Sequence, residues 1–93
     1  MLSREQAEAA VFKSRALVED GWTRTVEIVE LVQMPLAEAA PETLGLFDFL
    51  LFETLCWRCT YTTTDSFADG KVDGPCRAIC IIAQPVAEPV VLV

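Results

Sequence analysis

Residues 56–63 (CWRCTYTT) and 76–82 (CRAICII) are two β-prone runs that flank an Asp69-Gly70 pair. An Asp-Gly pair between such runs is a strong signal for a hairpin with a two-residue loop, in which both loop residues take positive φ. A loop at these two residues fixes the register of the hairpin. It predicts that Trp57 lies opposite Ile82, Cys59 opposite Cys80 and Tyr61 opposite Ala78.

The two strands of this hairpin share one apolar face, because side chains alternate between the two faces of a strand. An apolar face of this kind needs a covering layer, so we expect a packed hairpin with two cysteines side by side. The face carries Trp57, Cys59, Tyr61 and Thr63 from the first strand and Cys76, Ala78, Cys80 and Ile82 from the second.

The N-terminal segment has the pattern of a helix that covers this sheet. Ser3 followed by Gln6 predicts a capping box at the start of the helix. Small and apolar residues then recur at three- and four-residue spacing, and Gly21 is typical of a helix C-terminus. The pattern predicts a helix over about residues 3–20 that packs on the sheet through Ala10, Val11, Leu17 and Val18.

Two segments between the helix and the hairpin allow more than one interpretation. Residues 22–34 are rich in Thr, Val and Ile, which favour a strand with Trp22, Val26, Ile28, Val32 and Met34 on alternate positions. The helical alternative groups Val26, Val29 and Val32 with Trp22. Residues 44–55 fit either a helix that is apolar nearly all round or a buried strand.

The C-terminal residues, about 84–93, predict an extended tail. Pro85 and Pro89 make a central strand unfavourable there, and the apolar terminus Val90-Val91-Leu92-Val93 would be costly to leave in water. We expect it to dock as an edge strand on its own sheet or on a neighbour's sheet. Together these patterns predict one α+β domain over residues 1–93, with an N-terminal helix packed on a small antiparallel sheet that contains the cysteine-rich hairpin.

The composition suggests that part of the apolar surface is covered by another polypeptide. Hydrophobic residues make up 53% of only 93 residues, and the mean hydropathy is +0.38. A domain of this size has a modest core and a largely polar surface when it is monomeric. We therefore expect self-association or a protein partner, with the interface at Leu46, Phe47, Phe49, Phe52, Val90, Val91, Leu92 and Val93.

The charge and the apolar runs exclude some classes of partner. The net charge is −7 with only seven basic residues, so direct binding to nucleic acid is not expected. The longest apolar run, residues 44–57, contains Asp48 and Glu53 and is too short to span a membrane. The N-terminus lacks the pattern of a signal peptide, which favours a cytoplasmic location.

The four cysteines support three interpretations. The spacing Cys56-x2-Cys59 and Cys76-x3-Cys80 is suggestive of zinc binding, but strand geometry would point Cys56 and Cys59 to opposite faces. Cys59 and Cys80, placed opposite each other, could form a disulfide. The third interpretation is that the cysteines act as small buried hydrophobic residues.

These observations favour a non-catalytic role, because the chain has no histidine and no phosphate-binding loop. We expect an acidic interaction or structural subunit of a homo-oligomer or larger assembly, such as an accessory or phage-type component, without a cofactor. One alternative is a protein that binds zinc or performs thiol–disulfide chemistry through its cysteines. Another is an acidic inhibitor that mimics nucleic acid, which would need carboxylates clustered on one face.

Overall fold

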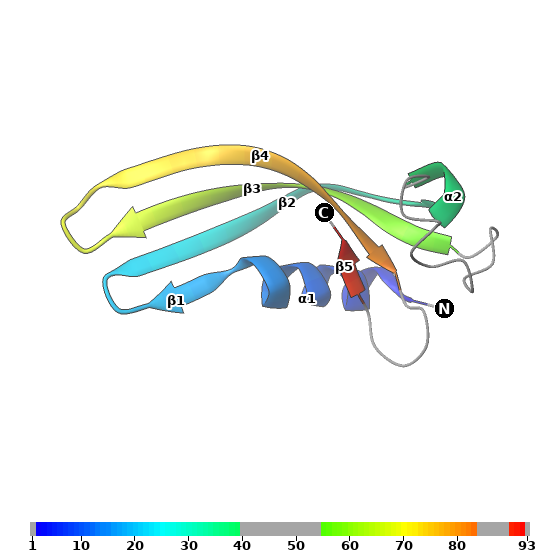
Figure 1. Ribbon diagram of the computed structural model, residues 1–93, viewed down its shortest axis with the longest axis horizontal. Helices are drawn as coiled ribbons and strands as arrows, with labels where there is room; N and C mark the ends of the chain where they lie inside the picture. Colours follow the sequence, from blue (N-terminus) through cyan, green and yellow to red (C-terminus); the bar gives the residue numbers. More distant parts are fainter. Residues whose placement is uncertain (1, 40–54, 84–89, 93) are drawn as a thin grey trace.

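The computed structural model describes residues 2–39, 55–83 and 90–92. Over these residues the chain is α+β, as the sequence predicts: an N-terminal helix packs on an antiparallel sheet in which each strand pairs with its neighbours in the chain (Figure 1). The elements are α1 (Arg4–Arg15), β1 (Leu17–Glu19), β2 (Trp22–Pro35), α2 (Leu36–Ala39), β3 (Leu55–Phe67), β4 (Val72–Ala83) and β5 (Val90–Leu92).

Helix α1 begins at the predicted capping box and ends earlier than predicted. The Ser3 hydroxyl accepts a hydrogen bond from the Gln6 backbone N–H, and the Gln6 side chain accepts one from the Ser3 N–H. The backbone becomes extended at Ala16, and Leu17 and Val18 belong to β1 instead of the helix. Pairing of β1 with β2 outweighs the helical periodicity here, and the Val18 side chain is 83% exposed.

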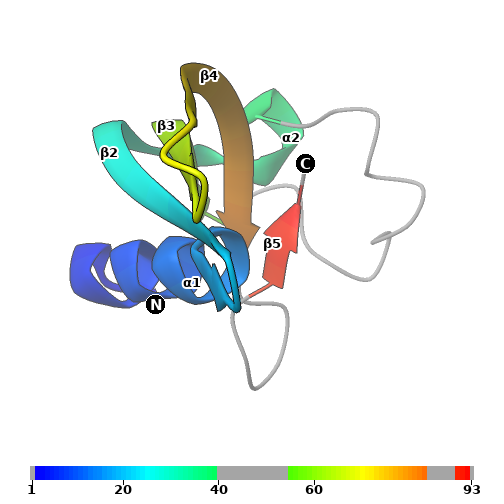
Figure 2. The same cartoon turned by 90° about the vertical axis from the view of Figure 1, so that its left-hand side faces the viewer.

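The sheet curves around α1, which lies on its concave face (Figures 1 and 2). The helix buries Ala7 and Val11 completely against this face. Two polar contacts anchor its N-terminal end: the Trp57 indole N–H donates to the Leu2 carbonyl at 2.9 Å, and Arg4 donates to the Leu31 carbonyl at 3.4 Å. The buried core residues of the concave face are Leu31, Cys59, Tyr61, Cys80 and Ile82.

Residues 22–35 form a strand, β2, so the helical alternative for this segment is wrong. The predicted alternation holds only up to Ile28. Ile28 pairs with Tyr61 and Glu30 pairs with Thr60, which leaves Val29 as a bulge. The extra residue moves every later side chain of β2 to the opposite face of the sheet. Val32 and Met34 therefore lie on the convex face, opposite to the prediction that they share a face with Trp22.

The β3–β4 hairpin has the pairs that the sequence predicts, but a different loop. Trp57 lies opposite Ile82, Cys59 opposite Cys80 and Tyr61 opposite Ala78. The loop, however, contains three residues, 68–70, since the Phe67 N–H donates to the Lys71 carbonyl. Of the Asp69-Gly70 pair only Gly70 has a positive φ, 89°, so the predicted two-residue loop is wrong.

A bulge in β4 restores the register that the longer loop would shift. Thr63 pairs with Cys76 and Asp65 pairs with Asp73, so Gly74 and Pro75 together oppose the single residue Thr64. The one-residue offset of the loop and that of the bulge cancel. The predicted pairs follow from this cancellation and not from the predicted turn.

The C-terminal strand adds to the chain's own sheet, one of the two expected arrangements. Val91 lies opposite Ile82 and packs against the concave-face core. A second, smaller cluster lies on the convex face where α2 covers it, and contains Cys56, Ile81 and Ala83. Of residues 44–55 only Leu55 is described, as the first residue of β3, so the rest of that segment stays untested. No helix in the described ranges is long and apolar enough to cross a membrane.

Candidate interaction surfaces

Cys59 and Cys80 face each other in the middle of the concave-face core, where both are free thiols without solvent exposure. Burial raises the pKa of Cys59 to about 12, and the neighbouring Cys80 adds to this. Burial also raises the pKa of Cys80, an effect that the positive charge of Arg15 partly opposes. Thiols in this state stay protonated at neutral pH, which makes them poor nucleophiles and poor metal ligands.

The other two cysteines lie elsewhere. Cys56 is buried in the convex-face cluster, where burial raises its pKa to about 11, and Cys76 is exposed on β4. All four cysteines are described, and no group of three or more His, Cys, Asp or Glu residues in the described ranges could hold a metal ion. Of the four residues of the zinc hypothesis, the structure brings only Cys59 and Cys80 directly opposite each other.

The convex face carries an exposed apolar patch, which we define as Val29, Val32 and Ile79. Their exposed fractions are 53%, 36% and 52%. The register places Val32 opposite Arg58 and Ile79 opposite Thr60, so the patch extends from β2 across β3 to β4. Arg58 is half-buried within it, and its Nε atom has no hydrogen-bond partner among the described residues. The patch thus combines apolar side chains with an arginine that a partner could satisfy.

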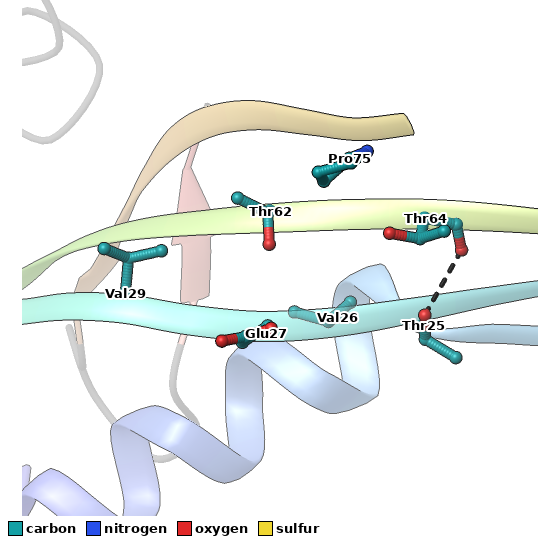
Figure 3. A pocket seen from close by; sticks show the side chains of 7 residues that line it. All are labelled: Thr25, Val26, Glu27, Val29, Thr62, Thr64 and Pro75. Carbon is teal, nitrogen blue, oxygen red and sulfur yellow. Dashed lines mark hydrogen bonds between the residues drawn. The ribbon is translucent and has the colours of Figure 1, made fainter. Parts of the chain in front are cut away.

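A groove beside Val29 of this patch is lined by residues of β2, β3 and β4 (Figure 3). Its polar groups are mainly threonine hydroxyls of β2 and β3, and Thr25 donates to the Thr64 carbonyl at 3.3 Å. No cationic side chain among the described residues lines it. The groove is lined by Thr25, Val26, Glu27, Val29, Thr62, Thr64 and Pro75.

The concave face has a second feature beyond the end of α1, which we name the open concave half: Trp22, Arg24, Asp65, Phe67 and Cys76. The Trp22 and Phe67 rings are nearly parallel, with centroids 6.4 Å apart, and the Arg24 guanidinium lies 5.2 Å from the Trp22 ring centroid. Arg24 also donates two hydrogen bonds to the Asp65 carboxylate, at 2.7 and 3.0 Å. This pairing holds the pKa of Asp65 below its usual value and raises that of Arg24.

Sequence reasoning missed the open concave half. Arg24 interrupts the apolar alternation of β2, and that interruption was the only local signal. Its partner Asp65 is 41 residues away, and only the observed register places the two side chains on one face.

The predicted interface residues are only partly described. Leu46, Phe47, Phe49, Phe52 and Val93 lie outside the described residues, so their role stays a prediction. Val90, Val91 and Leu92 form β5, and Val91 packs against its own core instead of presenting a free surface.

The described carboxylates are spread over the molecule. Glu5 and Glu8 lie on α1, while Glu27 and Glu30 lie on β2. Others lie at the two turns, among them Asp20 and Asp69. The hypothesis of acidic mimicry, which needs carboxylates clustered on one face, stays a prediction.

Comparison with known proteins adds no further constraint. No protein-family description matches this chain, and neither a curated protein nor a solved structure shows significant similarity to it. The functional argument therefore rests on the surfaces described above.

Proposed function

We propose that this protein is a non-catalytic interaction or structural subunit that works by binding protein, in a homo-oligomer or a larger assembly. The observation that carries this proposal is the exposed apolar patch on the convex face, Val29, Val32 and Ile79. Exposed apolar side chains that gather on one face of a soluble protein often mark a surface that binds protein. A partner that covers the three side chains would gain about 1–2 kcal/mol for each from the hydrophobic effect.

Arg58 adds polar specificity to the same surface. Its side chain is half-buried between Val32 and Ile81, and its Nε atom lacks a hydrogen-bond partner among the described residues. A carboxylate or carbonyl oxygen of a partner would satisfy this group, and arginine is one of the residue types enriched at protein interfaces.

The chemistry of the side chains supports binding over catalysis. The chain has no histidine, and burial keeps three of its four thiols protonated. We keep a cytoplasmic location as part of the proposal. Zinc binding and acidic mimicry remain alternatives, but no cluster of ligands or carboxylates in the described residues supports them.

The test is the mass of the purified full chain in solution, measured by light scattering and sedimentation over a range of concentrations. We expect a mass above the 10.3 kDa of one chain, or aggregation of the isolated protein. Val32→Glu and Ile79→Glu should reduce the association that the patch drives. Val18→Glu is the matched control, because it places the same charge at an exposed valine of the edge strand β1. A fully soluble monomer at all concentrations, unaffected by these variants, would refute the proposal.

A further inference from the structure

Helix α1 covers less than half of the concave face. Its 12 residues span about 18 Å at 1.5 Å per residue, whereas the 13 residues of β3 span about 43 Å at 3.3 Å per residue. The helix lies at the end of the sheet near β5, and the open concave half extends from its C-terminus to the two turns (Figure 1). A surface comparable in length to the helix is therefore left without a covering element in the described structure.

This uncovered surface carries an aromatic pair and an arginine, residue types enriched at protein interfaces, beside the carboxylates of Glu19, Asp65 and Asp73. Trp22 and Phe67 are stacked, and Phe67 is 40% exposed. The two hydrogen bonds from Arg24 to Asp65 hold the arginine over the Trp22 ring. Tryptophan and arginine side chains fixed in this way lose little conformational freedom when a partner binds.

The two ends of the open concave half carry opposite charges. At the helix end lie Lys13 and Arg15, the basic residues of the last turn of α1. Arg15 is half-buried, and its Nε atom has no hydrogen-bond partner in the described ranges. At the turn end, the exposed Asp20 makes no ion pair with a described residue.

Arg15 and Asp20 do not meet within one chain. The backbone is extended from Ala16 through β1, which carries Asp20 roughly 13 Å beyond the helix end at 3.3 Å per residue. The acidic turn and the basic helix end thus lie at opposite ends of one uncovered surface. A two-fold axis through the middle of that surface would exchange its ends.

We propose that the open concave half binds the open concave half of a second copy of this chain, with two-fold symmetry, so that Asp20 of each copy meets Arg15 of the other. This inference goes beyond the proposed function, because it assigns a partner to the face opposite the apolar patch. In the dimer each acidic turn lies where the other copy's helix ends, and the Trp22–Phe67 pairs of the two copies form the centre of the interface. The two charge contacts are identical, as an isologous interface requires.

Charge reversal tests the two contacts. We expect the unmodified protein to dimerise, and Arg15→Glu or Asp20→Arg alone to weaken the dimer at least tenfold, because each homodimer then contains two like-charge contacts. An equimolar mixture of the two variants should recover dimerisation to within about threefold of the unmodified protein. In that heterodimer both contacts again join opposite charges. Asp20 of the first variant meets Arg15 of the second, and the glutamate introduced at position 15 meets the arginine introduced at position 20. Sedimentation velocity of the unmodified protein, the two variants and their mixture measures this.

Arg77→Glu is the matched control, because it changes the net charge by the same amount at an exposed residue of the convex face. It should leave dimerisation unchanged, and circular dichroism of every variant checks its fold. Phe67→Ala provides a second, uncharged probe of the interface and should weaken the dimer about tenfold.

The outcomes separate this inference from the proposed function. A dimer that resists Arg15→Glu, Asp20→Arg and Phe67→Ala, but is lost in Val32→Glu, overturns the inference and leaves the proposed function standing. Failure of the mixed variants to recover also overturns it, since the contact is then not made between copies. A monomeric unmodified protein overturns the inference, and a monomer that also stays fully soluble refutes the proposed function.

Discussion

Gly74 is the residue at which the backbone of the hairpin is most constrained. Its φ is +110°, a region that side-chain-bearing residues rarely adopt. A Cβ atom placed there would lie 2.6 Å from the Thr63 carbonyl oxygen, which belongs to the backbone and cannot rotate away. The bulge that restores the β3–β4 register therefore depends on a glycine at this position.

We expect Gly74→Ala to reduce the free energy of unfolding by about 3 kcal/mol, from backbone strain and this close contact together. Gly70→Ala is the control, because Gly70 also has a positive φ but a Cβ atom there meets nothing within 4 Å. It should cost only about 1 kcal/mol. Urea denaturation followed by tryptophan fluorescence measures both, and equal effects would show that the contact with Thr63 does not matter.

The buried thiols make stability depend on alkaline pH. Unfolded cysteines ionise near pH 8.5, whereas in the folded chain the pKa is raised to about 12 for Cys59 and about 11 for Cys56. A raised folded-state pKa gives stability that is complete below the unfolded value and is lost as pH rises towards the folded value. We expect the free energy of unfolding to fall between about pH 9 and pH 11.

Cysteine variants isolate this effect from other titrations. Cys59→Ala should show a shallower decline, by about 1 kcal/mol per pH unit, when urea denaturation is compared at pH 8, 9 and 10. Cys56→Ala should also decline less steeply than the unmodified protein, because burial raises the pKa of Cys56 to about 11. Identical slopes for all three proteins would contradict the assignment of the effect to the buried thiols.

Among the elements, those with purely local signals could be predicted from the sequence. The start of α1 follows from Ser3 and Gln6, whose reciprocal hydrogen bonds involve only neighbouring residues. The strand character of residues 56–63 and 76–82 follows from their composition. The end of α1 was not predictable in the same way, because residues 17–19 are extended through pairing with β2, a contact that no local pattern records.

The face of the sheet that a side chain occupies was harder to predict than the strands themselves, and so were the surfaces that such side chains form. The two bulges show why. Val29 carries no turn signal, yet its insertion moves Val32 to the convex face and so forms the apolar patch. The Arg24–Asp65 pair likewise arises only once β2 and β3 are in register. Surfaces built across strands depend on pairing, which a single sequence specifies only through the sum of many weak contacts.

At the scale of the whole molecule, stability should be unequal along the sheet. The strand residues under α1, such as Cys59, are buried between the helix and the sheet. The ends of the same strands near the two turns have exposed side chains, including Ser66 and Phe67. Local opening needs less free energy where fewer apolar contacts are broken. The turn end should therefore open without unfolding of the helix end.

Amide hydrogen exchange, read residue by residue along β3, measures this difference in dilute protein. We expect protection at Thr64–Phe67 to be at least about tenfold lower than at Trp57–Tyr61, although both segments lie between β2 and β4. If two copies associate through the open concave half, raising the protein concentration should increase protection at Thr64–Phe67 and leave Trp57–Tyr61 unchanged. Uniform protection along β3 at low concentration would mean that α1 does not set the stability of the sheet, and the fold would then unfold as one unit.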